Sequence, residues 1–246
     1  MIVKYILILG IGHLLGDFYF QNEKIAKKKD EKMTGVLLHS AEYYLAVLAA
    51  ALPVLSIDMF VAVTCASLLH FVIDTIKFLL LKKKKIRKNG SVFIADQCVH
   101  IICILGLAYI MNYWNCKLGH LRIVSNISKA FDLNTEIAAR WILAVLFIHN
   151  PVNIFIQNFL GDYKPKDDQK IIQVDSKAGR RIGTIERMIM LIFLSLDQYA
   201  AMGFVLTAKS IARYDKISKD EKFAEYYLLG TLLSMLCVIV CKGLIL

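Results

Sequence analysis

The chain has 246 residues, of which 57% are hydrophobic, and its mean hydropathy is +0.55. These values argue against water as the solvent for most of the chain and favour a polytopic membrane protein. The formal charge of +10 first suggests nucleic acid, but the lysines lie in short clusters beside apolar runs, as in loops that face an anionic cytoplasmic leaflet. We therefore expect membrane lipids, and no nucleic acid, as partners.

Seven apolar segments approach the roughly 20 residues that a helix needs to cross the hydrocarbon core. They are residues 2–20, 35–55, 59–81, 92–113, 136–160, 182–208 and 223–246. The first lacks a small-residue cleavage site, so we expect a retained span and not a signal peptide. The fold class is therefore all-α, a polytopic membrane helical bundle with about six to seven transmembrane helices. We divide it into a four-helix His/Asp domain (1–115) and a C-terminal helical membrane region (116–246).

Three basic links separate these segments, at residues 24–32, 82–88 and 164–181. The positive-inside rule places them in the cytoplasm and predicts a multi-pass protein of the cell membrane with an extracytoplasmic N-terminus. Strict alternation would then put residues 209–222 outside, although these hold Lys209, Arg213, Lys216, Lys219 and Lys222. Either this loop is exported with the help of its acids, or residues 182–208 do not cross once. In the second case they form an interfacial helix or a re-entrant hairpin broken near 195–198.

The first four segments carry ionisable groups where a span should be apolar. Three His/Asp pairs have a spacing of four residues, and a further histidine stands alone. The residues are His13 and Asp17, His70 and Asp74, Asp96 and His100, and His39. Because residues i and i+4 share a face of a helix, each pair points a nitrogen and a carboxylate the same way.

The order within each pair follows the direction of its helix. Segments one and three run toward the cytoplasm and read His before Asp, whereas segment four runs away from it and reads Asp before His. At about 1.5 Å per residue, the aspartates and His39 then lie within a turn or two of the cytoplasmic boundary, and the other three histidines about one turn deeper. Two such layers predict that these side chains meet in one site.

Metal binding is the simplest explanation for this set of residues. A buried carboxylate costs several kcal/mol unless a cation compensates it. Three aspartates with one evident lysine, Lys77, leave negative charge, so we expect one or two divalent metal ions as the cofactor. Imidazole with carboxylate suits Zn²⁺, Mn²⁺ or Fe²⁺. The alternative is that the pairs are hydrogen-bonded contacts that hold helices together. Gln21 and Gln97, adjacent to this layer, are candidates to orient ligands or substrate.

The second half offers weaker signals. The sequence HNPVN, at 149–153, predicts a Pro-kinked helix with His149, Asn153 and Gln157 on one stripe, which either stabilises the kink or lines a polar path. Charged residues of the last segments, among them Glu186 and Lys209, are expected to form structural salt bridges. Five of the six cysteines lie in apolar segments and are expected to be buried thiols, with no disulfide framework.

Several of these stretches resemble a known family. They are HLLGDFYFQ (13–21), the lone His39, HFVIDTIK (70–77) and ADQCVH (95–100), followed by GRRIGTIER, GFVLTAKSIARY and AEYYLLGTLLS in the second half. In these residues the chain is similar to the uncharacterised bacterial membrane-protein family called domain of unknown function 3307. The His/Asp helices also resemble, more loosely, bacterial membrane-bound metal-dependent hydrolases, and that likeness implies metal-assisted hydrolysis.

Three functions fit these residues. The first is a membrane-embedded metal-dependent hydrolase of a lipid-phase phosphoester or pyrophosphate, with Asp17 and Asp96 as candidate bases and Lys77 neutralising the leaving group. The second is a metal-ion or proton-coupled transporter, in which the same side chains bind the cargo. The third is a metal-stapled membrane scaffold or sensor. Because the polar groups of the first four segments gather near one side of the membrane, they favour the enzyme.

Overall fold

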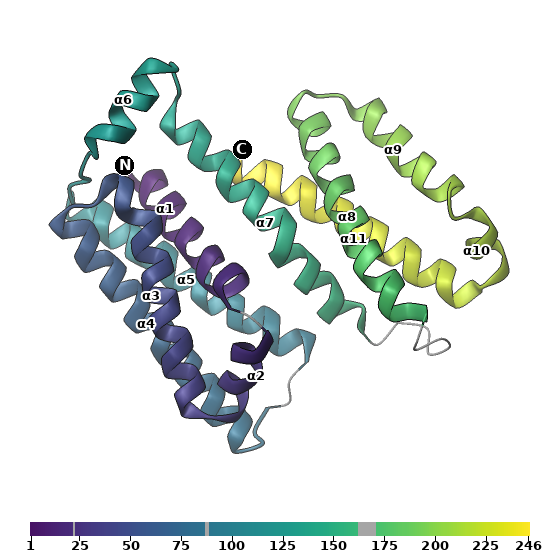
Figure 1. Ribbon diagram of the computed structural model, residues 1–246, viewed down its shortest axis with the longest axis horizontal. Helices are drawn as coiled ribbons and strands as arrows, with labels where there is room; N and C mark the ends of the chain where they lie inside the picture. The colour runs from purple at the N-terminus through teal and green to yellow at the C-terminus, as the bar shows by residue number, and fades with distance from the viewer. Residues whose placement is uncertain (22, 87–88, 162–170) are drawn as a thin grey trace. The chain divides into compact units, whose positions relative to one another are not determined.

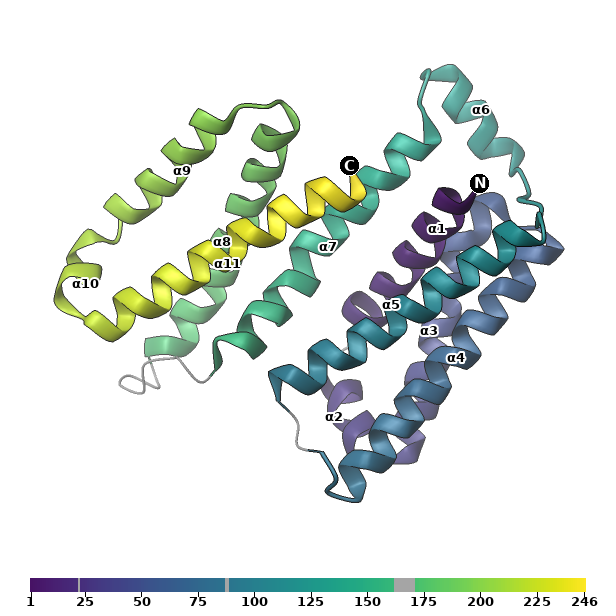
Figure 2. The same cartoon turned by 180° about the vertical axis from the view of Figure 1, so that it is seen from behind.

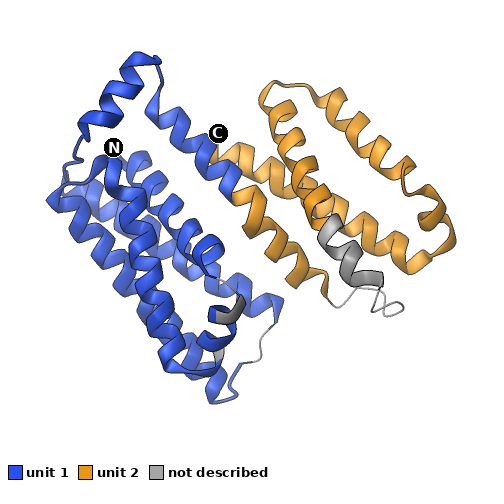
Figure 3. Ribbon diagram, in the orientation of Figure 1, with its two compact units in different colours: residues 1–146 blue, residues 147–246 orange. Residues whose placement is uncertain are grey.

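The computed structural model describes residues 1–21, 23–86, 89–161 and 171–246, and every regular element within these residues is a helix (Figure 1). Arg87 and Lys88 of the second basic link, and Lys164 of the third, lie outside them. The chain forms two compact units, residues 1–146 and 147–246 (Figure 3). The all-α fold class is confirmed, and the division expected after residue 115 stays a prediction.

Unit 1 is built on four long apolar helices that pack side by side (Figures 1 and 2). They are α1 (Ile2–Leu14) with its continuation Leu15–Phe20, α3 (Met33–Ala51), α4 (Ile57–Lys82) and α5 (Gly90–Tyr113). Helix α1 packs on α3 and α5, and α4 packs on both α3 and α5. Gly12 lets α1 approach the main chain of α3, because a Cβ there would lie 2.8 Å from the Cα atom of Val47. The core between these helices is apolar, with Tyr5, Leu9, Val47, Met59, Val63 and Ala108 all buried.

Side chains at the helix starts explain where two of these helices begin. Ser56 Oγ accepts a hydrogen bond from the Met59 amide (3.0 Å), and Asn89 Oδ1 accepts one from the Val92 amide (2.9 Å). Each residue satisfies an amide that has no partner within its helix. The short helix α2 (Glu23–Glu31) lies in the first basic link and packs on α3 and α4. Another short helix, α6 (Arg122–Ala130), follows α5 and precedes α7 (Thr135–Phe159), which continues into unit 2.

Unit 2 contains the later part of α7 with α8 (Ile171–Ser195), α9 (Tyr199–Ile211), α10 (Tyr214–Lys219) and α11 (Glu221–Ile245). Pro151 interrupts the hydrogen bonding of α7, and polar side chains serve the carbonyls beside it. Asn153 Nδ2 donates to the His149 carbonyl (2.7 Å), and Arg187 Nε donates to the Ile148 carbonyl (2.9 Å). Both contacts satisfy main-chain carbonyls beside Pro151, which is the role that the kink-stabilising alternative gives to polar side chains. The expected salt bridge is confirmed at Lys209 and Glu186, whose charged atoms are 2.6 Å apart.

Six helices in the described residues are long and apolar enough to cross a membrane. They are 2–20, 33–54, 57–82, 90–113, 135–159 and 221–245. Residues 182–208 do not form one helix, because α8 ends at Ser195 and α9 begins at Tyr199, with Asp197 at a φ of 54° in the turn. The break falls at 195–198, where the hairpin alternative placed it. The structure therefore does not support the expectation that residues 182–208 cross the membrane once as a single helix.

A candidate metal centre

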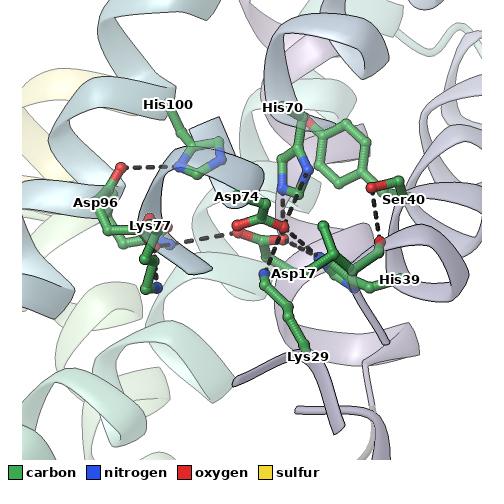
Figure 4. A network of polar contacts seen from close by, with 12 residues as sticks. Asp17, Lys29, His39, Ser40, His70, Asp74, Lys77, Asp96 and His100 are labelled. Carbon is green, nitrogen blue, oxygen red and sulfur yellow. Dashed lines mark hydrogen bonds and ion pairs between the residues drawn. The ribbon is translucent and has the colours of Figure 1, made fainter. Parts of the chain in front are cut away.

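Four helices of unit 1 bring the predicted ligand residues together (Figure 4). Their ligand atoms form three overlapping groups, in each of which all the atoms lie within 4.8 Å of one another. The groups are His13, Asp17 and His70; His39, His70 and Asp74; and Asp74, Asp96 and His100. All seven residues named from the sequence belong to this cluster, which we call the His/Asp cluster. The chain therefore has groups of side chains that could hold a metal ion.

The cluster is almost completely shielded. The four histidines are each at most 3% exposed, and Asp74 is 1% exposed. The side chains of Asp17 and Asp96 are 5% and 7% exposed. Charges and imidazoles buried this deeply must be compensated by one another or by a bound cation.

Asp17 orients two of the imidazoles. Its Oδ1 atom lies 2.8 Å from His70 Nε2 and 3.1 Å from His39 Nε2, and Gln97 Nε2 donates to Oδ2 (3.3 Å). Because a carboxylate only accepts, both Nε2 atoms carry the hydrogen, which leaves the Nδ1 atom of each neutral ring with a lone pair. The lone pair of His70 Nδ1 then faces Asp74 Oδ2 at 3.6 Å. Two electron-rich atoms at this distance repel one another unless a cation lies near both.

His100 has the opposite tautomer, fixed by a different contact. Its Nδ1 atom lies 2.8 Å from the Asp96 main-chain carbonyl, which can only accept, so Nδ1 donates and Nε2 carries the lone pair. His100 Nε2 is buried without a hydrogen-bond partner among the described residues, and so are His13 Nε2, His39 Nδ1 and Asp74 Oδ1. An unsatisfied buried polar atom costs about 1–3 kcal/mol. Imidazole nitrogens fixed by a hydrogen bond on the far side of the ring are the usual ligands of a divalent metal.

Two lysines complete the cluster, and the sequence pointed to only one of them. Lys77 Nζ contacts Asp96 Oδ2 at 2.8 Å. Lys29, from the polar helix α2, places Nζ 2.6 Å from Asp74 Oδ2. Burial alone would lower the pKa of Lys29, but the negative charges of Asp17 and Asp74 outweigh burial and raise it above 10.5, so the side chain is an ammonium. With neutral histidines, three carboxylates and two ammonium groups leave a net charge of −1, less negative than the −2 that the sequence suggested.

Glycines explain how Lys29 and its neighbours reach the cluster. A Cβ atom at Gly35 would overlap the main-chain atoms of Lys28 and Lys29, so only glycine lets α2 lie this close to α3. Gly16 plays the same part for Tyr43, whose ring would meet a Cβ there. The Tyr43 ring stacks on His70 with centroids 3.6 Å apart, and its hydroxyl is 3.4 Å from His13 Nδ1. Tyr43 follows His39 by four residues, a spacing that would have been the sequence signal for its place here.

Asp17 lies on an irregular part of the chain. Residues Leu15–Phe20 continue α1 as a π-helix, with wider turns than an α-helix. As a result the Asp17 carboxylate is 4.0 Å from His13 Nδ1, its predicted partner, and closer to the rings of His39 and His70. π-Helical turns inside α-helices are frequent at functional sites.

A small pocket adjoins the cluster. It is lined by Tyr43, His70 and His100 on the polar side and by Ile73 and Cys103 among its apolar residues, with a volume of about 10 Å³. This volume holds about one water molecule or ion. It does not hold a lipid headgroup. Of the charged side chains in the cluster, Lys77 is the most exposed, at 22%.

The fold and the cluster together define a polytopic helical bundle of the membrane type with a buried His/Asp centre. The chain belongs to the family described as "Protein of unknown function (DUF3307)", whose model matches residues 5–127. That range includes the whole His/Asp cluster. Searches of curated proteins and of solved structures find no match to the chain.

Proposed function

We propose that this protein is an integral membrane protein that binds a divalent metal ion, Zn²⁺, Mn²⁺ or Fe²⁺, at the His/Asp cluster. One observation carries the proposal: among the described residues, nitrogens of His13, His39 and His100 and the Oδ1 atom of Asp74 are buried without hydrogen-bond partners, and they belong to the same few side chains. Mixed imidazole and carboxylate donors suit these metals better than Mg²⁺ or Ca²⁺, which prefer shells of oxygen alone. The overlap of the three groups leaves room for one ion or for two.

The chemistry we propose for this centre is hydrolysis of a phosphoester on a lipid-phase substrate. A bound divalent metal would supply a Lewis acid and make water a nucleophile near neutral pH. Lys77 has the most exposed side chain of the cluster, at 22%, and its Nζ atom contacts Asp96 Oδ2 at 2.8 Å. Lys77 is suited to binding a phosphate oxygen, and Asp96 to accepting a proton once Lys77 has turned to the phosphate. Asp17 is suited to positioning His39 and His70, because its Oδ1 atom accepts from both.

A metal measurement tests the binding site. The protein, purified in detergent, is analysed for bound metal beside His100→Ala and the control His120→Ala, in which an exposed histidine outside the cluster is removed. We expect stoichiometric metal in the wild type and in the control, and a loss of most of it in His100→Ala. Equal metal content in all three proteins, or none in any, would overturn the proposal.

A metal-stapled scaffold is the second candidate, favoured by the size of the pocket, which at about 10 Å³ admits an ion and no substrate. Release of phosphate from phospholipid and lipid pyrophosphate in mixed micelles separates the two. The hydrolase predicts turnover that disappears in Lys77→Met, whereas the scaffold predicts no turnover and a thermal stability that falls when a chelator removes the metal.

A further inference from the structure

The Lys29 ammonium contacts the Asp74 carboxylate, which a metal ion in the cluster would need as a ligand. Asp74 belongs to two of the three candidate metal groups, and its Oδ2 atom is in contact with the Lys29 ammonium at 2.6 Å. Lys29 reaches this point from outside the bundle of spans, because α2 is a polar helix in the first basic link. Its neighbours Lys27 and Lys28 are exposed, whereas the Lys29 side chain is 10% exposed.

The charge of the cluster opposes the simultaneous presence of Lys29 and a metal ion. Asp17, Asp74 and Asp96 with Lys29 and Lys77 carry a net charge of −1. A divalent cation added to this set gives +1, whereas the same cation in place of Lys29 gives zero. Since an unbalanced charge is costly in a shielded, low-dielectric site, the neutral combination is the favoured one.

The packing of α2 allows Lys29 to leave. Among the described side chains of α2, residues 25–29 and 31, Lys29 alone is buried. Ile25 and Ala26 are half-buried and the others are exposed, so the described side chains of α2 bury little apolar surface, and the helix is held mainly by its main-chain contact at Gly35 and by Lys29. The contact of the Lys29 ammonium with Asp74 is therefore a principal attachment of α2.

We propose that Lys29 and a divalent metal ion compete for Asp74, so that metal binding expels the ammonium and releases α2 from the cluster. This inference rests on the metal site proposed above and adds its regulation. While the site holds no metal, the Lys29 ammonium balances the negative charge of Asp74. Because a metal ion must displace this ammonium, Lys29 lowers the affinity of the site for metal. Metal occupancy is thereby coupled to the position of a basic helix at the surface of unit 1.

The test measures Zn²⁺ affinity in detergent by competition with a chromophoric chelator. The proteins are the wild type, Lys29→Met, the control Lys28→Met at an exposed neighbouring position, and the double variant Lys29→Met/His100→Ala. We expect Lys29→Met to bind Zn²⁺ about tenfold more tightly or better, which corresponds to about 1.4 kcal/mol. Lys28→Met should match the wild type, and the double variant should lose the gain in affinity. All four proteins contain the same native cysteines, so any Zn²⁺ bound by these thiols is a common background.

Limited digestion with trypsin reports the position of α2 in the same samples. Zn²⁺ should speed cleavage after Lys27, Lys28 and Lys32 in the wild type, while cleavage after the exposed Lys82–Lys85 stays constant as an internal reference. Equal or weaker Zn²⁺ affinity in Lys29→Met, with binding that still depends on His100, would overturn the competition and leave the metal centre standing. Absence of binding that depends on His100 in both proteins would overturn both proposals.

Discussion

Asp17 determines which nitrogen of two histidines faces the centre of the cluster. Its Oδ1 atom accepts from His39 and His70, and its Oδ2 atom accepts from Gln97. These three donors come from α3, α4 and α5, so one carboxylate on the continuation of α1 joins all four long helices of unit 1. Asp17 therefore contributes to the stability of the bundle as well as to the orientation of metal ligands.

The variant Asp17→Asn tests this contribution. The amide removes the charge from three hydrogen bonds and turns an NH₂ group toward either the imidazoles or the Gln97 amide, which are themselves donors. We expect a loss of about 2 kcal/mol and a fall of several degrees in the midpoint of thermal unfolding in detergent. The control Asp132→Asn, at an exposed residue with a φ of 49° that asparagine tolerates, should unfold like the wild type. Identical midpoints for both variants would contradict a stabilising role.

Arg187 joins the helices of unit 2 in the way that Asp17 joins those of unit 1. It is 1% exposed, and its guanidinium donates to the Ile148 carbonyl, to Asn153 Oδ1 and to Ser234 Oγ, which joins α8 to α7 and α11. Lysine has the charge but not the planar set of donors, so Arg187→Lys leaves some of these acceptors unsatisfied. We expect a loss of about 2 kcal/mol or more in thermal or chemical unfolding of the whole chain. Arg180→Lys, a change at an exposed arginine of the same helix, serves as the reference and should have no such effect.

The sequence predicted the metal-ligand candidates better than their surroundings. The four-residue spacing and the order of each His/Asp pair depend only on helix geometry. They therefore predict a shared site for His13, His70 and His100 without any knowledge of helix packing. Lys29 was not predicted, because it lies in a polar link whose fold depends on Gly35. Tyr43 was not predicted either, because its role comes from stacking on His70, a contact between two helices.

At the scale of helices, α2 depends on Gly35 for its position. In Gly35→Ala the new Cβ atom would overlap main-chain atoms of Lys28 and Lys29, which cannot rotate away as a side chain can, so α2 must move and withdraw the ammonium from Asp74. We expect faster trypsin cleavage after Lys27 and Lys28 in metal-free protein. Gly106→Ala is the matched control, because nothing lies within 4 Å of a Cβ at that position of α5. An unchanged cleavage rate in Gly35→Ala would show that α2 is not held by this contact.

Two features of the fold, the π-helix at Leu15–Phe20 and the turn between α8 and α9, could not be predicted from hydropathy. Hydropathy found Leu15–Phe20 to be part of a span but could not show its wider turn, because the mean hydropathy of a segment does not depend on how its residues are wound. The turn at 196–198 interrupts an apolar run, Ile182 to Ala208, that length alone assigns to a span. In that case the five bases of residues 209–222 were the better guide than the hydropathy.

For the whole molecule, six spans instead of seven remove the conflict between the positive-inside rule and the alternation of successive spans. If α1 enters from outside, the spans α3, α4, α5 and α7 alternate so that residues 24–32, 82–88 and 164–181 face the cytoplasm. If α8 and α9 enter and leave the membrane on that side as a hairpin broken at 196–198, residues 209–222 also face the cytoplasm, and α11 carries the C-terminus out. Every lysine-rich link then lies in the cytoplasm, together with the end of unit 1 that holds Lys29.

This topology makes opposite predictions from a seven-span topology at two positions. Alkaline phosphatase, which is active only outside the cytoplasm, is fused after Lys219 in a truncated chain and after Leu246 in the complete one. We expect the first fusion to be inactive and the second to be active, because α11 crosses the membrane between them. A single crossing by residues 182–208 predicts the reverse at both points, so activity at Lys219 with none at Leu246 would refute the six-span arrangement. A cytoplasmic fluorescent protein at the same two positions gives the complementary readout, and agreement between the reporters guards against a fusion that fails to fold.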